Sequence, residues 1–116
     1  MADENDVPSS LGDAISRKRK ALGLSQRELA ERIKKEDGQP ITPQYLNDIE
    51  RDRRTPSSDN MVEQFASALG IDQEYLRKFA GKYPSDIVKA QVGEAEFTRE
   101  LRAFRQRLQF VSKKQG

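Results

Sequence analysis

The feature that most constrains the fold of this chain is a series of start and stop signals for short helices. Ser25 is followed three residues later by Glu28, which is the spacing of a capping box at a helix N-terminus. Thr42 is a favoured N-cap residue, and Pro43 has the backbone angle that suits the first helical position. Glycine, which readily adopts the left-handed conformation that ends a helix, follows three of the predicted helices, at Gly23, Gly70 and Gly81.

The apolar residues between these signals recur at spacings of three and four, which is the period of an amphipathic helix. No stretch alternates apolar and polar residues as a half-buried strand does. The fold class is therefore predicted to be all-α, with a compact core of about five short helices and a C-terminal helical extension. The five helices are predicted at about residues 10–22, 25–33, 42–50, 57–69 and 72–80.

The length of 116 residues and a hydrophobic content of 34% suit one modest core rather than two independent domains. Residues 1–9 are polar and acidic and are predicted to be a disordered tail. Residues 10–81 hold the helical core, and residues 82–116 form the extension.

The chain contains no cysteine and no histidine. This composition removes thiol nucleophiles, the usual zinc ligands and the commonest general base. No phosphate-binding glycine loop is present either, so we expect neither an enzyme nor a cofactor or metal. No signal peptide or membrane segment is visible, and we expect a cytoplasmic protein without membrane contact.

The charges are unevenly distributed, although the net charge is only +2. One basic run covers residues 17–20, and a second includes Arg51, Arg53 and Arg54 directly after the predicted third helix. Arginines at such a position suit contacts with DNA phosphates, which fix the register of a protein without reading sequence.

The third predicted helix has one polar face and one apolar face. Leu46 and Ile49 lie on the side that should dock, whereas Gln44, Asn47 and Asp48 lie on the other. Glutamine and asparagine can each form two hydrogen bonds with adenine, and aspartate can accept one from cytosine. This composition is typical of a helix that reads bases in the major groove. On an ordinary amphipathic helix the same residues would simply be solvated.

The order of several motifs resembles the Cro/repressor-type, or Xre, family of helix-turn-helix transcriptional regulators. The resemblance extends from residue 11 to about residue 72 and implies a five-helix, lambda-repressor-like domain that binds operator DNA as a dimer. The motifs that carry it are Leu24-Ser25-Gln26, Leu29-Ala30, Ile41-Thr42-Pro43-Gln44-Tyr45-Leu46, Ile49-Glu50, Arg54 and Pro56-Ser57.

The resemblance also implies roles for particular residues. Arg19 and Glu50 match a buried ion pair that joins the first and third helices. The side-chain chemistry leaves two roles open for each of two further residues. Asp48 either pairs with cytosine or orients Arg51 or Arg54, the role we favour, and Tyr45 either packs or offers its hydroxyl to a phosphate. The expected base-reading residues are Pro43, Gln44, Tyr45, Asn47 and Asp48. The expected phosphate contacts are Ser25, Gln26, Arg27, Arg51, Arg53 and Arg54.

The chain departs from this family in the link between the second and third helices, which is about six residues longer than the usual tight turn. The added residues either extend the second helix and bring Lys34 or Lys35 near the DNA backbone, or form a solvated surface loop. Charged surface loops are common, and we favour the loop.

The extension contains a predicted helix over about residues 94–110 with a heptad stripe of apolar residues. Such an apolar face must be buried against the helical core of its own chain, against the same helix of a second subunit, or against another protein. Dimerisation is favoured, because two recognition helices must be held about 34 Å apart to read a palindromic operator. The stripe consists of Phe97, Leu101, Phe104, Leu108 and Val111.

These observations predict a sequence-specific DNA-binding regulator, most simply a repressor that binds double-stranded DNA as a homodimer. The alternative is an antitoxin-like protein that neutralises a partner through its C-terminal helix and regulates its own gene by binding DNA. An adaptor that does not bind DNA is disfavoured by the arginine cluster.

Overall fold

The computed structural model describes residues 7–115, and this part of the chain consists of seven helices without a named strand. The all-α class predicted from the sequence is confirmed. The helices are α1 (Leu11–Ala21), α2 (Gln26–Glu31), α3 (Pro43–Glu50), α4 (Asp59–Leu69), α5 (Gln73–Phe79), α6 (Ser85–Lys89) and α7 (Glu94–Gln115). The short helix α6 was not expected from the sequence.

Most helices begin where the sequence places a cap. The Ser25 hydroxyl accepts a hydrogen bond from the Glu28 backbone N–H at 3.0 Å, and the Glu28 carboxylate accepts one from the Ser25 N–H at 3.0 Å. Thr42 accepts from the Tyr45 N–H at 3.0 Å. Ser10, Ser58 and Asp72 cap α1, α4 and α5 in the same way.

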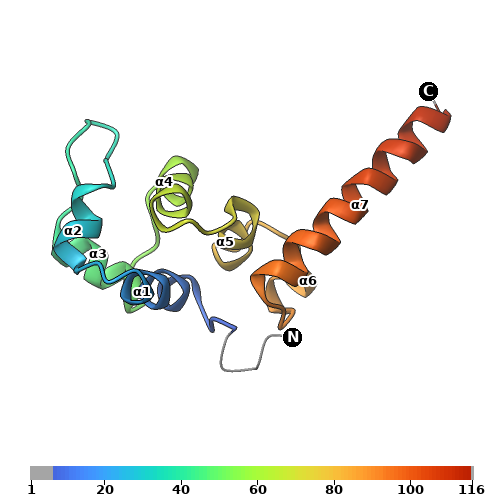
Figure 1. The fold of residues 1–116 in the computed structure, drawn as a ribbon. Helices are drawn as coiled ribbons and strands as arrows, with labels where there is room; N and C mark the ends of the chain where they lie inside the picture. Colours follow the sequence, from blue (N-terminus) through green and yellow to red (C-terminus); the bar gives the residue numbers. More distant parts are fainter. Residues whose placement is uncertain (1–6, 116) are drawn as a thin grey trace.

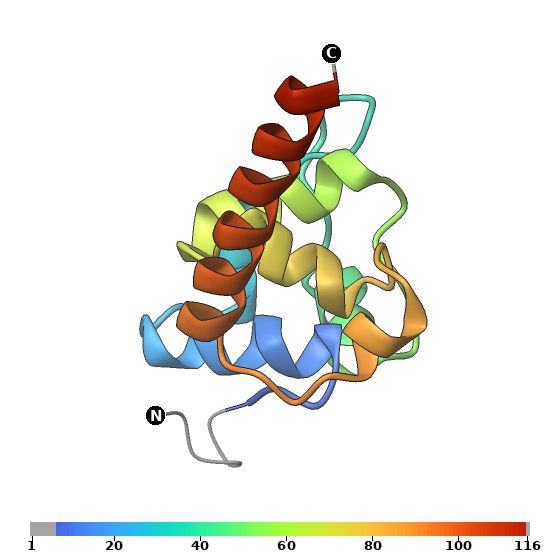
Figure 2. The same cartoon turned by 90° about the vertical axis from the view of Figure 1, so that its right-hand side faces the viewer.

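The core lies between α1, α3, α4 and α5, with α2 packed beside α3 (Figures 1 and 2). Its largest fully buried apolar side chain is Phe65 of α4. Leu46 and Ile49 are 0% and 1% exposed, so the apolar face of α3 docks as expected. Because α3 is held on this side, its polar side is left facing outward.

The second helix is shorter than expected, since α2 ends at Glu31. Ile33 is buried, but it belongs to the link that follows, not to the helix. The link does not extend α2, and residues 34–40 are exposed, in agreement with the surface loop that we favoured.

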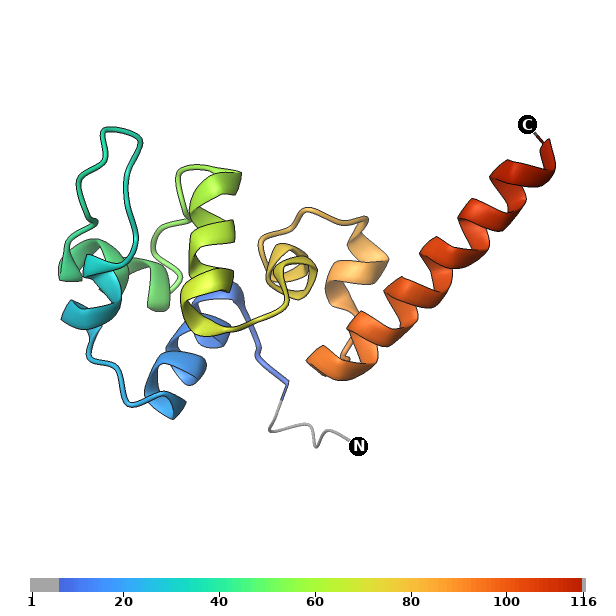
Figure 3. The same ribbon diagram turned by 45° about the horizontal axis from the view of Figure 1, so that its top comes forward.

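The C-terminal helix is longer than predicted and divides into two parts. Its first turns pack on the core, where the centre of the Phe97 ring lies 5.7 Å from the ring centres of both Tyr75 and Tyr83. Phe97 is 8% exposed, so it is a core residue of its own subunit and not part of an outer interface. Beyond this point α7 projects from the body (Figure 3), and Phe104, Leu108 and Val111 are about half exposed.

The predicted acidic tail lies largely outside the described residues, which begin at Val7. Ser9 is described, and both its N–H and its hydroxyl donate to the Asp13 carboxylate, at 2.9 and 3.2 Å. Within residues 7–115, no helix combines the length and the apolar character needed to cross a membrane.

Candidate nucleic-acid interface

The N-terminal end of α3 presents polar side chains to solvent. Gln44 is exposed, and its side-chain N–H donates to the Asp48 carboxylate one turn later, at 3.1 Å. The sequence favoured a role for Asp48 in orienting Arg51 or Arg54, whereas in the structure it orients Gln44. This bond orients the Gln44 amide, and the amide oxygen does not take part in it.

Tyr45 and Arg54 form a second unit beside this end. The Tyr45 ring is half-buried and packs on the core, and the Arg54 guanidinium lies 4.2 Å from the ring centre. Such a cation–π contact restrains a long side chain that would otherwise move freely. Arg51 and Arg53 are exposed in the same loop, and the Arg53 N–H donates to the Asp48 carbonyl at 2.9 Å.

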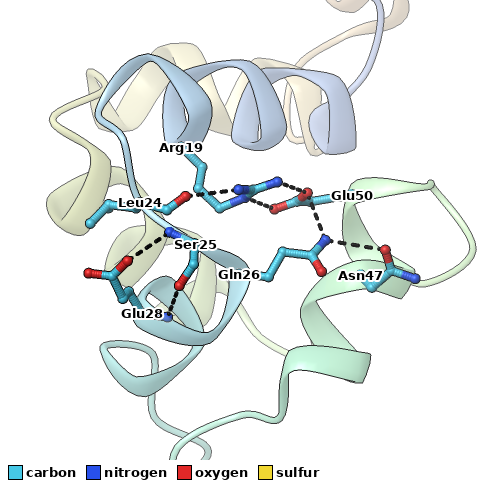
Figure 4. A network of polar contacts seen from close by, with 7 residues as sticks. All are labelled: Arg19, Leu24, Ser25, Gln26, Glu28, Asn47 and Glu50. Atoms are coloured by element: carbon cyan, nitrogen blue, oxygen red, sulfur yellow. Dashed lines mark hydrogen bonds and ion pairs between the residues drawn. The ribbon is translucent and has the colours of Figure 1, made fainter.

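Gln26 joins the start of α2 to α3, as Figure 4 shows. Its side-chain amide donates to the Asn47 oxygen at 3.2 Å and to the Glu50 carboxylate at 3.1 Å. Gln26 and Asn47 are both half-buried, and this hydrogen bond links their side chains. Ser25 and Arg27, which flank Gln26, are exposed.

Arg19 and Glu50 form the buried ion pair that the family resemblance implied. The Arg19 Nε and Nη2 donate to the two Glu50 carboxylate oxygens at 2.7 and 3.0 Å. The Arg19 Nη1 donates to the Leu24 carbonyl at 2.9 Å. Only 10% of the Arg19 side chain and 5% of the Glu50 side chain are exposed. Hydrogen bonding to Glu50 raises the pKa of Arg19 above its ordinary value. This pair fixes α3 against α1 and the turn before α2.

Asp52 is a positioning residue that the sequence did not reveal. Its carboxylate accepts from the Gly12 N–H at 3.1 Å and from the Ser10 hydroxyl at 2.7 Å, so it supports the N-terminus of α1. Asp52 has a φ of 59°, which is uncommon for a residue other than glycine. Its partners lie about forty residues earlier in the chain, and no local pattern indicates such a contact.

A close approach of α1 to α3 accompanies this contact. A Cβ atom placed on Gly12 would lie 2.4 Å from the Ile49 carbonyl oxygen and 2.6 Å from that of Glu50. Only glycine fits there without a backbone shift.

Residues 15–63 match the model of a helix-turn-helix family. The matched segment begins in α1, contains α2 and α3, and ends in α4. It is a helix-turn-helix domain of the Xre, or Cro/repressor, type. The Xre family is one of DNA-binding transcription regulators and not of enzymes, so the chain carries a DNA-binding domain.

Two solved structures are similar to the whole chain or to this Xre domain. A complex of the SinR and SinI proteins shows 25% identity and a TM-score of 0.51, covering 85% of this chain and 98% of that one. The crystal structure of SinR, the master regulator for biofilm formation, in complex with DNA shows 31% identity and a TM-score of 0.47. That match covers 58% of this chain and 97% of the other. No curated protein matches the chain.

Proposed function

We propose that this Xre-family protein is a sequence-specific transcriptional regulator that binds a palindromic operator as a dimer and represses by covering promoter DNA. The observation that carries the proposal is the polar end of α3, where Asp48 holds the exposed Gln44 amide while Leu46 and Ile49 anchor the helix in the core. A restrained glutamine amide suits two hydrogen bonds to adenine in the major groove.

The base-reading residues of this proposal are Pro43, Gln44, Tyr45, Asn47 and Asp48. Among them, Gln44 has the most exposed polar side chain, whereas the Asn47 oxygen is already bound by Gln26. Gln44 therefore makes the main sequence-specific contact. Tyr45 chiefly holds Arg54 in place by the ring contact.

The phosphate contacts of this proposal come from both sides of α3. Arg51, Arg53 and Arg54 lie in the loop after it. Ser25, Gln26 and Arg27 lie at the start of α2, where the helix dipole also favours a phosphate. Gln26 would contribute its backbone N–H, because its side-chain amide already donates to Asn47 and Glu50. These contacts position the domain on the duplex without reading its sequence.

The dimer interface of the proposal is the projecting part of α7. Leu101 is half-buried and Phe104, Leu108 and Val111 remain available, since Phe97 is occupied by its own core. An apolar face that is half exposed in the subunit is a usual site of association. Pairing of two such helices would link two recognition helices.

A second candidate function is favoured by one of the similar structures, because SinR forms a complex with the SinI protein. On this alternative, the exposed face of α7 binds a regulatory protein, as in an antitoxin-like regulator, and the DNA-binding domain controls the protein's own gene.

Selection of bound duplexes from a randomised library tests the operator proposal. The full-length protein is expected to recover a palindrome whose half-sites lie about one helical turn apart. Recovery of a single half-site would contradict dimeric binding, and recovery of no common sequence would contradict sequence-specific recognition.

Sedimentation of the full-length protein tests the dimer. Leu108→Asp places a charge in the apolar stripe and should convert a dimer into a monomer, whereas the matched change Gln106→Asp, at an exposed position of the same helix, should not. A wild-type protein that sediments as a monomer at the concentrations at which it binds DNA would favour the partner-binding alternative.

A further inference from the structure

The link between α2 and α3 is folded as a small hairpin, here called the inserted hairpin, residues 33–41. The Ile41 N–H donates to the Ile33 carbonyl at 2.9 Å, and the Lys35 N–H donates to the Gln39 carbonyl at 2.8 Å. Gly38 has a φ of +85° and closes the turn by donating to the Lys35 carbonyl at 2.9 Å. The added residues therefore form an ordered element instead of an irregular loop.

The inserted hairpin is fixed to the core at its base. Ile33 and Ile41 are 0% and 3% exposed, so both ends are buried. The Gln64 side chain of α4 binds both backbone groups of Lys34. It accepts from the Lys34 N–H at 2.7 Å and donates to the Lys34 carbonyl at 2.9 Å. This clamp fixes the direction in which the hairpin projects.

The position of the inserted hairpin places it next to the proposed DNA surface. It leads directly into Thr42, the N-cap of α3, and residues 34–40 are all exposed. Figures 1 and 3 show it at the end of the molecule that holds α2 and α3, opposite to α7. An element at this place lies beside a groove that the N-terminal end of α3 enters.

The two lysines of the inserted hairpin stand beside two acidic residues, Glu36 and Asp37, but their own contacts are an exposed ion pair and a neutral carbonyl. The Asp37 carboxylate accepts from the Gln39 N–H at 2.9 Å, and its ion pair with the Lys35 ammonium is long, at 4.0 Å, and about half exposed on both sides. Such a surface pair is weak, so a phosphate can compete for Lys35. The Lys34 ammonium donates to the Glu31 carbonyl at 3.1 Å, a neutral partner at the end of α2. A phosphate oxygen is a stronger acceptor for an ammonium than a carbonyl is.

We propose that the inserted hairpin is a second DNA-contacting element, whose Lys34 and Lys35 bind the phosphate backbone beside the groove that α3 enters. This inference rests on the proposed function. It adds to the helix-turn-helix motif a contact that lengthens the protected stretch of DNA and leaves sequence reading to α3.

The salt dependence of binding measures such contacts directly. For the full-length Lys34→Ala/Lys35→Ala variant on the selected duplex, the slope of log affinity against log salt should become shallower by about 1.8, or about 0.9 per lost contact. The preference for that duplex over a scrambled one should stay unchanged. The matched control is Lys89→Ala/Arg99→Ala, which removes the same charge from exposed residues of α6 and the first turns of α7, away from α2, α3 and the projecting part of α7. Its slope should equal that of the wild type.

A charge reversal at the hairpin tip provides a test by gain of binding. Glu36 is exposed, and Glu36→Lys should steepen the salt slope and extend the hydroxyl-radical footprint on the flank that the hairpin covers. The proposal is overturned if Lys34→Ala/Lys35→Ala and Glu36→Lys both keep the wild-type slope and footprint. In that case an intact preference for the selected duplex would leave the proposed function standing. Loss of preference in Gln44→Ala alone would not affect the hairpin proposal.

Discussion

The ion pair between Arg19 and Glu50 gives a sharp prediction about stability. Its two hydrogen bonds, of 2.7 and 3.0 Å, join side chains that are only 10% and 5% exposed. Removing one partner leaves a buried charge without its counter-ion, which costs about 3–5 kcal/mol. We therefore expect Arg19→Met or Glu50→Met to lower the free energy of unfolding by about that amount. With a urea m-value of about 1.5 kcal/mol per molar, the unfolding midpoint falls by roughly 2–3 M.

The double variant Arg19→Met/Glu50→Met separates this mechanism from simple loss of packing. With both charges removed, no unpaired charge is buried, and the double variant should be more stable than either single variant. Arg17→Met is the control, because Arg17 pairs with Asp13 at the surface and such pairs contribute about 1 kcal/mol or less. A loss of less than about 1 kcal/mol in each single variant would refute a buried ion pair, and so would a double variant that loses the sum of the two.

Three further predictions follow from the described contacts. Gly12→Ala should lower the free energy of unfolding by about 3 kcal/mol, because its Cβ would lie 2.4 Å from the Ile49 carbonyl oxygen. Chemical denaturation measures this value, and an unchanged free energy of unfolding would mean that α1 moves aside. Thr98→Val should raise that free energy by about 1 kcal/mol in the same assay, since the buried Thr98 hydroxyl has no hydrogen-bond partner among residues 7–115. A loss of stability would mean that the hydroxyl is satisfied. The hydrogen bond from the Ser25 N–H lowers the pKa of Glu28 below its ordinary value. The capping box is therefore fully intact above the unfolded-state pKa and is lost as pH falls through the lower folded-state pKa. Exchange of the Ser25 amide hydrogen should accelerate over that acid window relative to the Glu28→Gln variant, whereas identical pH profiles would contradict the capping role.

Local chemistry was sufficient to predict most helix starts. Ser25, Thr42 and Asp72 cap their helices in the structure because each side chain binds backbone groups only two or three residues away. The docking face of α3 was predictable for a similar reason, since helical spacing alone puts Leu46 and Ile49 on one side.

Contacts between distant residues were not predictable in this way. The sequence assigned Ile33 to α2, whereas it pairs across the inserted hairpin with Ile41, and nothing in either residue specifies that partner. A heptad stripe likewise shows that the apolar face of α7 must be buried, but it does not show which helix or chain buries it. Tyr75 and Tyr83 cover Phe97 in the same subunit, and this packing depends on how α5 and the link to α7 fold. The helix α6 has only five residues, too few for a periodic signal.

The central claim, that α3 reads DNA sequence, is tested most directly by comparing two variants on the selected and scrambled duplexes across a range of salt. Gln44→Ala should abolish the preference between the duplexes. Arg54→Ala should weaken binding to both and reduce the salt slope by about one, with the preference retained. A Gln44→Ala variant that keeps the wild-type preference, or a wild type that does not distinguish the duplexes, would contradict sequence reading by α3.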